Sequence, residues 1–358
     1  MMCTTRAARI GLLSTTAVSL LATACTGSGS STPSTTAATP SSTPPSTSSA
    51  PAKPAPKPAK KKPAVNPFIG IGPVPRTPVI AVKIDDTPPG RPQLGIDKAD
   101  IVYIEAAEGG LTRLAAIFGT RKPYVGYVRS TRPSDPDLLL QYGRITEAYS
   151  GGAHDSLPRV RRSGITSWSN DAGAPFYSRV NRAKSSYINL VLNLTRVAKR
   201  VRTNRPRNIG WTFAALLKGI TPKPGYAVHT VVGGAYNTGT AVTFLYDRKL
   251  RKYIRYIDGV KQFAADGRPI ATRNVVVQSC TIHAHPRDTD VLGNPSQFTY
   301  TVGHGAVSVF RYGKRIDGYW VRKKLWQGTR LVTAKGKPIP LAPGNSWVVL
   351  IRKGIAVR

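Results

Sequence analysis

Four arginines between residues 91 and 132 have the chemistry of an anion site. They are Arg91, Arg113, Arg129 and Arg132. A guanidinium group binds phosphate or carboxylate through two parallel hydrogen bonds. Two glycine pairs nearby, Gly109-Gly110 and Gly151-Gly152, would let backbone N–H groups approach such a ligand, although paired glycines also build tight turns. The alternative is that the arginines form structural ion pairs with neighbouring acids. The acids available for this are Asp85, Asp100, Glu105 and Glu108.

Three of these acids are also candidate catalytic groups. A glycan hydrolase or transferase needs an acid and a base beside one bond, and Glu105 with Glu108 would be that pair, with Arg113 and Arg129 as further site residues. Asp85, at the end of a predicted strand, is the third candidate. Residues three apart on a strand point to opposite faces, which argues against convergence of the two glutamates. The chain has 52 Lys+Arg against 17 Asp+Glu, so salt bridging is the simpler account.

The histidines predict no catalytic or metal centre. His154-Asp155-Ser156 contains the residue types of a catalytic triad, but adjacent residues cannot converge as a relay requires, and we expect Asp155 or Ser156 to start a short helix. His283 and His285 share one face of a possible strand extension and could bind a metal with a third ligand. No such ligand stands at a fixed spacing, and Pro286 is expected to end the strand. We therefore predict neither a metal nor a cofactor.

Cys25 ends an N-terminal segment with the features of an export signal. Arg6 and Arg9 precede an apolar run over residues 10–24, which is shorter than the roughly 20 residues that cross a bilayer. A cysteine at the cleavage position predicts lipidation of Cys25. An ordinary cleaved signal peptide and a retained membrane anchor are the alternatives. Cys280 then has no internal disulfide partner, and we expect it to be a small buried hydrophobic residue.

The segment 25–66 is predicted to be a disordered tether, because it is almost entirely Ser, Thr, Pro, Ala, Gly and Lys. The formal charge of the chain is +35, and residues 66–358 alone carry 45 Lys+Arg against 17 Asp+Glu, which leaves +28. Such a body is expected to bind polyanions. No nucleic-acid-binding motif is present, so we expect anionic wall polymers, acidic glycans or anionic lipid as partners. The alternative is that the arginine content reflects genome composition.

The remaining chain predicts an α+β fold in two modules. The N-terminal module, residues 67–235, mixes helices and strands, and the C-terminal module, residues 236–358, is mostly antiparallel β-structure. Strands in the first module are expected at residues 78–84, 100–107 and 111–119, with a hairpin turn at Glu108-Gly109-Gly110. Strands in the second module are expected at residues 242–247, 252–257, 260–263, 274–282, 298–302, 306–311, 318–322, 329–332 and 346–351.

Three helices are expected in the N-terminal module besides the short one near Asp155. Asp135-Pro136-Asp137 has the cap and proline of a helix start, and Gly143 is expected to end that helix. Apolar residues at helical spacing predict the longest helix over residues 185–201. A short helix is predicted over residues 211–218. Trp211, Trp320, Trp326 and Trp347 are expected to be core residues, although one exposed tryptophan would suit a glycan.

An ordered set of motifs over about residues 77–353 resembles the YerB-like lipoprotein family, whose two modules are domains of unknown function. In the first half the motifs are Asp85, Arg91-Pro92-Gln93, Ala99-Asp100, Glu105, residues 108–113, residues 126–133 and Ser150-Gly151-Gly152. In the second half they are residues 274–278, 309–314, 318–320 and 341–347. Members tend to carry Pro-His-Asn after an Arg-Ala pair, whereas here Arg182-Ala183 precedes Lys184-Ser185-Ser186. A mechanism that needs a histidine there is not expected in this chain.

The resemblance implies an exported, lipid-anchored envelope protein without an established activity. We predict that it is held by Cys25 on the outer face of a bacterial cytoplasmic membrane. Its basic body is expected to bind an anionic wall polymer, a glycan or an envelope protein. The alternatives are the hydrolase or transferase built on Glu105 and Glu108, and a scaffold for other envelope proteins.

Overall fold

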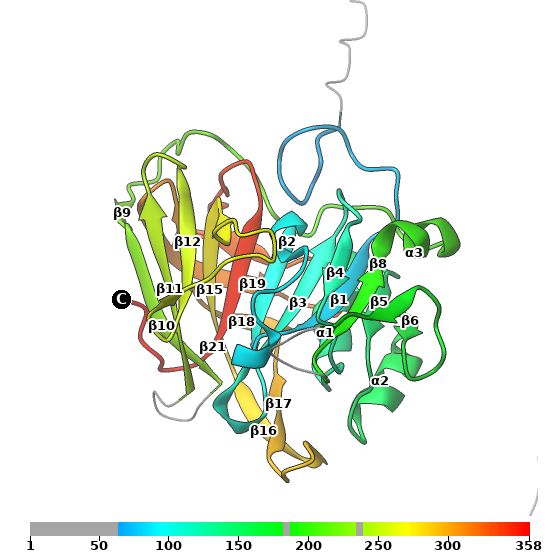
Figure 1. Cartoon of the computed structure of the whole chain (residues 1–358). Coiled ribbons are helices and arrows are strands. Elements are labelled where there is room, and N and C mark those ends of the chain that lie inside the picture. The colour runs from blue at the N-terminus through cyan, green and yellow to red at the C-terminus, as the bar shows by residue number, and fades with distance from the viewer. Residues whose placement is uncertain (1–63, 182–186, 234–238) are drawn as a thin grey trace, which may run out of the picture. The chain divides into compact units, whose positions relative to one another are not determined.

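The computed structural model describes residues 64–181, 187–233 and 239–358 (Figure 1). The predicted signal segment, Cys25 and the tether up to residue 63 lie outside the described residues, as do Arg182-Ala183 and Lys184-Ser185-Ser186. The described chain is mostly β-strand with few, short helices. No helix in these three ranges combines the length and apolar character needed to span a membrane.

The largest sheet has 11 strands and contains segments from both halves of the chain. Its strands, in spatial order, are β20 (Arg330–Val332), β19 (Lys314–Arg322), β18 (Gly303–Arg311), β15 (Asn274–Cys280), β21 (Ser346–Arg352), β2 (Ile101–Ala106), β3 (Thr112–Phe118), β1 (Ile80–Asp85), β5 (Thr146–Tyr149) and β6 (Thr166–Ser169), with β9 (Lys223–Pro224) paired to β19. The strand β21 joins the two halves, because it runs parallel to β15 on one side and to β2 on the other.

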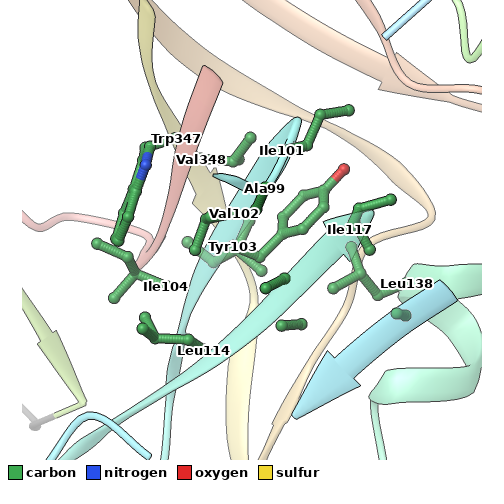
Figure 2. Packing of buried hydrophobic residues seen from close by; sticks show 14 of the residues in the cluster. Ala99, Ile101, Val102, Tyr103, Ile104, Leu114, Ile117, Leu138, Trp347 and Val348 are labelled. Atoms are coloured by element: carbon green, nitrogen blue, oxygen red, sulfur yellow. The ribbon is translucent and has the colours of Figure 1, made fainter. Parts of the chain in front are cut away.

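The join is buried on both faces of the sheet. Every residue of β2 is buried, and so is every residue of β21 except the last. Figure 2 shows Trp347 and Val348 of β21 beside β2, with Tyr103 of β2 on the side where Leu138 lies. Continuous apolar strands of this kind are typical of sheets covered on both faces. The two halves therefore share one hydrophobic core.

The hairpin predicted around Glu108-Gly109-Gly110 is confirmed. Strands β2 and β3 are antiparallel, and the turn between them is a 3₁₀ helix, η3 (Glu108–Gly110). Gly109 and Gly110 have φ angles of 62° and 76°, which favour glycine, so this pair builds the turn. Strand β1 also forms where expected, antiparallel to β3 and parallel to β5. Two further 3₁₀ turns, η1 (Pro88–Gly90) and η2 (Ile96–Lys98), lie between β1 and β2.

Two predicted helix starts are confirmed, and both helices are short. Helix α1 (Asp135–Leu139) continues as the 3₁₀ helix η4 (Leu140–Tyr142) and ends at Gly143. Helix α2 (Ser156–Ser163) begins directly after Asp155.

The predicted helix over residues 185–201 is wrong for residues 187–193, whereas residues 194–200 are helical. Its described part begins at residue 187 and enters the strand β8 (Leu190–Asn193), which forms a three-stranded sheet with β4 (Tyr124–Gly126) and β7 (Tyr177–Arg179). Only α3 (Leu194–Arg200) is helical there, capped by the Asn193 side chain, which accepts a hydrogen bond from the backbone N of Arg196 at 3.0 Å. Strand pairing overrides helical spacing in this apolar run.

The predicted helix over residues 211–218 is also absent. Phe213 instead forms a parallel bridge with Leu341, and the backbone N of Ala214 donates to the Leu341 carbonyl at 3.0 Å. Leu216 is 74% exposed. The segment lacks a continuous apolar stripe that a helix could bury, and its backbone hydrogen bonds go to a neighbouring loop.

The C-terminal half adds a second sheet and a separate hairpin. The sheet contains β10 (Ala227–Gly233), β11 (Gly239–Asp247), β12 (Lys252–Ile257), β13 (Val260–Lys261) and β14 (Ala271–Thr272), and the hairpin contains β16 (Ile282–Thr289) and β17 (Pro295–Thr299). The expectation that Pro286 ends its strand is wrong, because β16 passes through it with a register shift between His285 and Thr289. The predicted strand over residues 298–302 lies earlier, as β17.

Cys280 and most of the tryptophans belong to the core, as predicted. Cys280 is a buried free thiol, and burial raises its pKa to about 12. Trp211, Trp320 and Trp347 are buried, whereas Trp326 is 63% exposed.

Candidate functional site

The β-sheet register brings three of the sequence-predicted site residues into one row. Asp85 of β1 lies opposite Arg113 of β3, and Arg113 lies opposite Glu105 of β2. Directly opposed residues project from the same face of a sheet. A carboxylate, a guanidinium and a second carboxylate therefore stand side by side at the end of β1.

Asp85 is the acid that gathers two of the four arginines. Its Oδ2 lies 2.7 Å from Arg113 Nη1 and 3.1 Å from Arg129 Nε. Its Oδ1 accepts hydrogen bonds from the backbone N of Thr87 at 2.7 Å and from the Thr87 hydroxyl at 2.5 Å. Burial, together with the positive charge of Arg132, lowers the pKa of Arg113 to about 10. The Asp85 carboxylate therefore pairs with two arginines and accepts hydrogen bonds from the turn that follows β1.

Glu108 holds the third arginine at the hairpin turn. Arg132 Nη2 donates to Glu108 Oε2 at 2.6 Å, and the Ser296 hydroxyl donates to Oε1 at 2.6 Å. Burial alone would raise the pKa of Glu108, but Arg132 and Ser296 hold it below its usual value. Because Ser296 belongs to β17, this contact also ties the hairpin of the second half to the first.

Asp86, which the sequence analysis did not single out, is buried and contacts two arginines. One is Arg91, the fourth of the predicted arginines, and the other is Arg255. The Arg255 guanidinium donates Nη1 to Oδ1 at 3.0 Å and Nη2 to Oδ2 at 2.6 Å. The Thr112 hydroxyl donates to Oδ2 at 2.6 Å, and Gln93 Nε2 donates to Oδ1 at 3.0 Å. Arg91 donates to the Asp86 carbonyl. The sequence feature that could have indicated Asp86 is the pair Asp85-Asp86 at the end of a buried strand.

A second group of buried charges lies beside this row and was also missed. Lys83 is fully buried and donates to Glu105 and, at 2.8 Å, to Asp135 Oδ1. Asp135 and Glu105 raise the pKa of Lys83 despite its burial. Burial and the charge of Asp135 raise the pKa of Glu105 to about 7. The signal for this group was a lysine inside the apolar run of residues 78–84.

Glu147 completes the buried group and shares the Thr131 hydroxyl with Asp135. The Thr131 hydroxyl lies 2.7 Å from Glu147 Oε1 and 3.0 Å from Asp135 Oδ2. A hydroxyl has one proton, so one of these two contacts needs a protonated carboxyl group. Burial and the negative charge of Asp135 raise the pKa of Glu147 to about 8, which assigns that proton to Glu147 at neutral pH.

The other residues considered from the sequence have structural partners. Asp100 accepts hydrogen bonds from the backbone N of Gly119 and of Thr120, each at 2.7 Å, rather than from an arginine. Gly151 accepts a backbone hydrogen bond from Thr131 at 3.0 Å, so the second glycine pair supports the loop that carries Arg129 and Arg132.

The triad-like tripeptide connects helix α2 to the hairpin β16–β17. His285 Nε2 lies 2.9 Å from Asp155 Oδ2, and the Ser156 hydroxyl donates to Asp288. Ser156 therefore contacts a carboxylate and not a histidine. Within residues 64–181, 187–233 and 239–358, no cluster of three or more His, Cys, Asp or Glu side chains could hold a metal ion.

The arrangement suits charge neutralisation better than acid–base chemistry. A glycosidase needs two carboxyl groups that face one substrate bond. Here Glu105 binds Lys83, and Glu108 binds Arg132 and Ser296. The contacts of Asp86 with Arg255, and of Glu108 with Ser296, instead join segments 169 and 188 positions apart.

Comparisons with known proteins match both halves of the chain. The model of the N-terminal domain of DUF3048, a protein of unknown function, matches residues 71–207, and the model of the DUF3048 C-terminal domain matches residues 232–348. YerB of Bacillus subtilis (strain 168), whose name marks it as a candidate lipoprotein, is 29% identical over 280 residues, which are 76% of this chain and 80% of that protein. A crystal structure of YerB from Bacillus subtilis aligns with a TM-score of 0.68 at 22% identity, and covers 82% of this chain and 99% of the other.

Proposed function

The chain belongs to the YerB-like DUF3048 family, and from this membership we propose that it is a lipid-anchored envelope protein whose basic body binds an anionic wall polymer. The anchor is the lipidated thiol of Cys25. The name of the Bacillus relative supports the anchor. The partner is a polymer that bears phosphate or carboxylate groups on the outer face of the cytoplasmic membrane.

The observation that carries the polymer proposal is the unequal burial of acids and bases. Eight of the 17 acidic residues are buried. They are Asp85, Asp86, Asp100, Glu105, Glu108, Asp135, Glu147 and Asp288. Of the 43 basic residues that the structure describes, six are buried. They are Lys83, Arg113, Arg132, Arg255, Arg311 and Arg322.

Folding therefore gives the surface a higher ratio of basic to acidic residues than the whole sequence has. Outside the core, the described chain has 37 basic residues against nine acidic ones. Such an excess raises the local concentration of polyanions and speeds their association. The same burial argues against a carboxylate hydrolase, because Asp85, Glu105 and Glu108 are enclosed with cations.

The test is a co-sedimentation assay of the purified protein with purified phosphate-rich wall polymer over a salt series. Raising the salt from about 0.05 M to about 0.5 M shortens the screening length from about 14 Å to about 4 Å, so we expect bound protein to decrease steeply. Uncharged wall glycan is the control. Binding that is absent, or that does not respond to salt, would contradict the proposal.

A further inference from the structure

A polar cavity of about 500 Å³ lies where the two halves of the chain meet. It is bounded by the residues before β2 and after β3 on one side, and by β12, β14 and the loop before β21 on the other. Its volume is in the range of small-molecule sites. Five of its lining residues are basic: Lys98, Arg121, Lys252, Arg268 and Arg273.

Two of these five cations are neutralised within the described chain. Asp97 pairs with Lys98 and, at 3.0 Å, with Arg268. Asp266 also pairs with Arg268, at 2.5 Å. The other lining acid, Asp100, has its Oδ2 occupied by two backbone N–H groups.

The other three cations, Arg121, Lys252 and Arg273, form no ion pair with any residue in the three described ranges. Lys252 and Arg273 also affect each other. Burial lowers the pKa of Lys252, and the positive charges of Arg273 and Arg268 lower it further. Like charges held together in a partly buried place favour an anion between them. The cavity thus has the charge of an anion site.

The fold holds Arg273 in place from two sides. Its backbone N donates to Asn345 Oδ1 at 3.2 Å, and its Nη1 donates to the Arg251 carbonyl at 3.1 Å. Gly344 leaves room for the side chain, because an added Cβ there would lie 2.8 Å from Arg273 Cβ. Arg273 Nε is buried without a hydrogen-bond partner among the described residues. A buried donor without a partner carries a free-energy cost that a bound acceptor would remove.

We propose that this cavity binds a phosphate ester group through Arg273, Lys252 and Arg121. The inference rests on the proposed function and names the site at which the wall polymer is held. A guanidinium supplies paired donors to phosphate oxygens, and an ammonium adds a compact charge. The sequence-predicted arginines are less suited to this role, because Arg113, Arg129 and Arg132 already pair with Asp85 and Glu108.

The experiment measures binding of inorganic phosphate, glycerol 3-phosphate and a soluble poly(glycerol phosphate) to the full-length protein. The test variant, called the cavity pair, combines Lys252→Gln with Arg273→Gln. The matched control is Arg161→Gln with Lys335→Gln, which removes the same charge from two exposed positions outside the cavity. Loss of two charge-assisted contacts is expected to weaken binding of all three probes tenfold or more, roughly. The control pair is expected to change it less than about twofold.

Two further variants separate binding from folding. Arg121→Gln changes an exposed side chain and should weaken binding without lowering the melting temperature. Arg273→Lys keeps the charge but loses the paired donors, so it should bind glycerol 3-phosphate more weakly than the wild type. Equal binding by the wild type, the cavity pair and Arg121→Gln would overturn the proposal.

The outcomes distinguish the cavity from the proposed function. If the cavity pair binds poly(glycerol phosphate) as well as the control pair does, the cavity assignment fails and the polymer proposal stands. If the wild type binds glycerol 3-phosphate but not the polymer, the cavity stands and the polymer proposal fails. Vesicles of phosphatidylglycerol, compared with phosphatidylcholine, form the last arm. Binding to these vesicles alone, lost in the cavity pair, would assign the phosphate to a lipid headgroup and overturn the wall-polymer source.

Discussion

Asp86 and Arg255 lie 169 positions apart in the sequence and form a fully buried, two-pronged ion pair, with oxygen–nitrogen distances of 2.6 and 3.0 Å. The Arg255 guanidinium also lies over the Trp347 ring, 4.7 Å from its centroid. Asp86 follows β1, Arg255 belongs to β12, and Trp347 belongs to β21. One side chain of the five-stranded sheet therefore contacts residues of both family domains at the 11-stranded sheet.

Breaking this pair should be costly. Asp86→Asn leaves the Arg255 charge buried without its carboxylate, and we expect a loss of about 3–5 kcal/mol in the free energy of unfolding. Lys223→Gln, which removes one partner of an exposed ion pair with Asp317, should cost less than about 1 kcal/mol. Urea denaturation measures both values, and the slope of the unfolding free energy against urea concentration should be the same in the variants and the wild type. A loss below about 1 kcal/mol for Asp86→Asn would show that the pair does not stabilise the fold.

The stability of the protein should fall as the pH rises through the neutral range, because of Glu147 and Glu105. Their folded pKa values, about 8 and about 7, lie above the ordinary 4.5 of a glutamate, so the folded state binds more protons than the unfolded state between these limits. Their stabilising contribution is therefore complete below about pH 4.5 and is lost as the pH rises to about 8. Each group contributes a slope of at most about 1.4 kcal/mol per pH unit.

Glu147→Gln tests this sign, because the amide resembles the protonated acid. The unfolding free energy of the variant should decline less than that of the wild type between pH 5 and pH 8. The stability of the variant relative to the wild type should therefore be greater at pH 8 than at pH 5. Asp247→Asn is a matched surface control, since Asp247 caps an exposed turn by accepting from the backbone N of Leu250. Identical slopes for the wild type and Glu147→Gln would refute the neutral state of Glu147.

Local signals in the sequence predicted the hairpins well. Strands β2 and β3 were predictable because two apolar runs flank a Gly-Gly turn. The strand at residues 190–193 was not, since its leucines and valine fit both a helical and an extended pattern. What decides between them is pairing with β4, which lies more than 60 residues earlier in the chain.

The candidate site was predictable only in part, for a related reason. The sequence marks Asp85, Glu108 and the arginines as residues able to form ion pairs, but not which acid meets which base. Arg255 offers no local sign that its partner is Asp86, because the contact is made by the sheet topology. Lys83 carried a signal that could have been used: a lysine in an otherwise apolar buried strand needs carboxylates around it.

Cys280 should be chemically inert in the folded protein. It is fully buried, and its raised pKa of about 12 leaves almost no thiolate at pH 8. Iodoacetamide at pH 8 is therefore expected to leave Cys280 unmodified in native protein and to modify it fully in guanidinium chloride. Peptide mass spectrometry assigns the label to this position. Rapid labelling under native conditions would contradict the burial of the thiol.

Cys25 should carry the lipid that holds the protein to the membrane. Each buried methylene contributes about 0.8 kcal/mol, so several acyl chains bind far more firmly than one. The mature protein is expected to begin at Cys25, to carry acyl chains by mass spectrometry, and to sediment with membranes. Cys25→Ser should prevent acylation and leave a precursor that still contains residues 1–24 or a product released from the membrane. Cys280→Ser is the control and should leave membrane attachment unchanged. Mature protein that starts elsewhere and lacks acyl chains would refute the anchor, and with it the assignment of the tether beginning at residue 25.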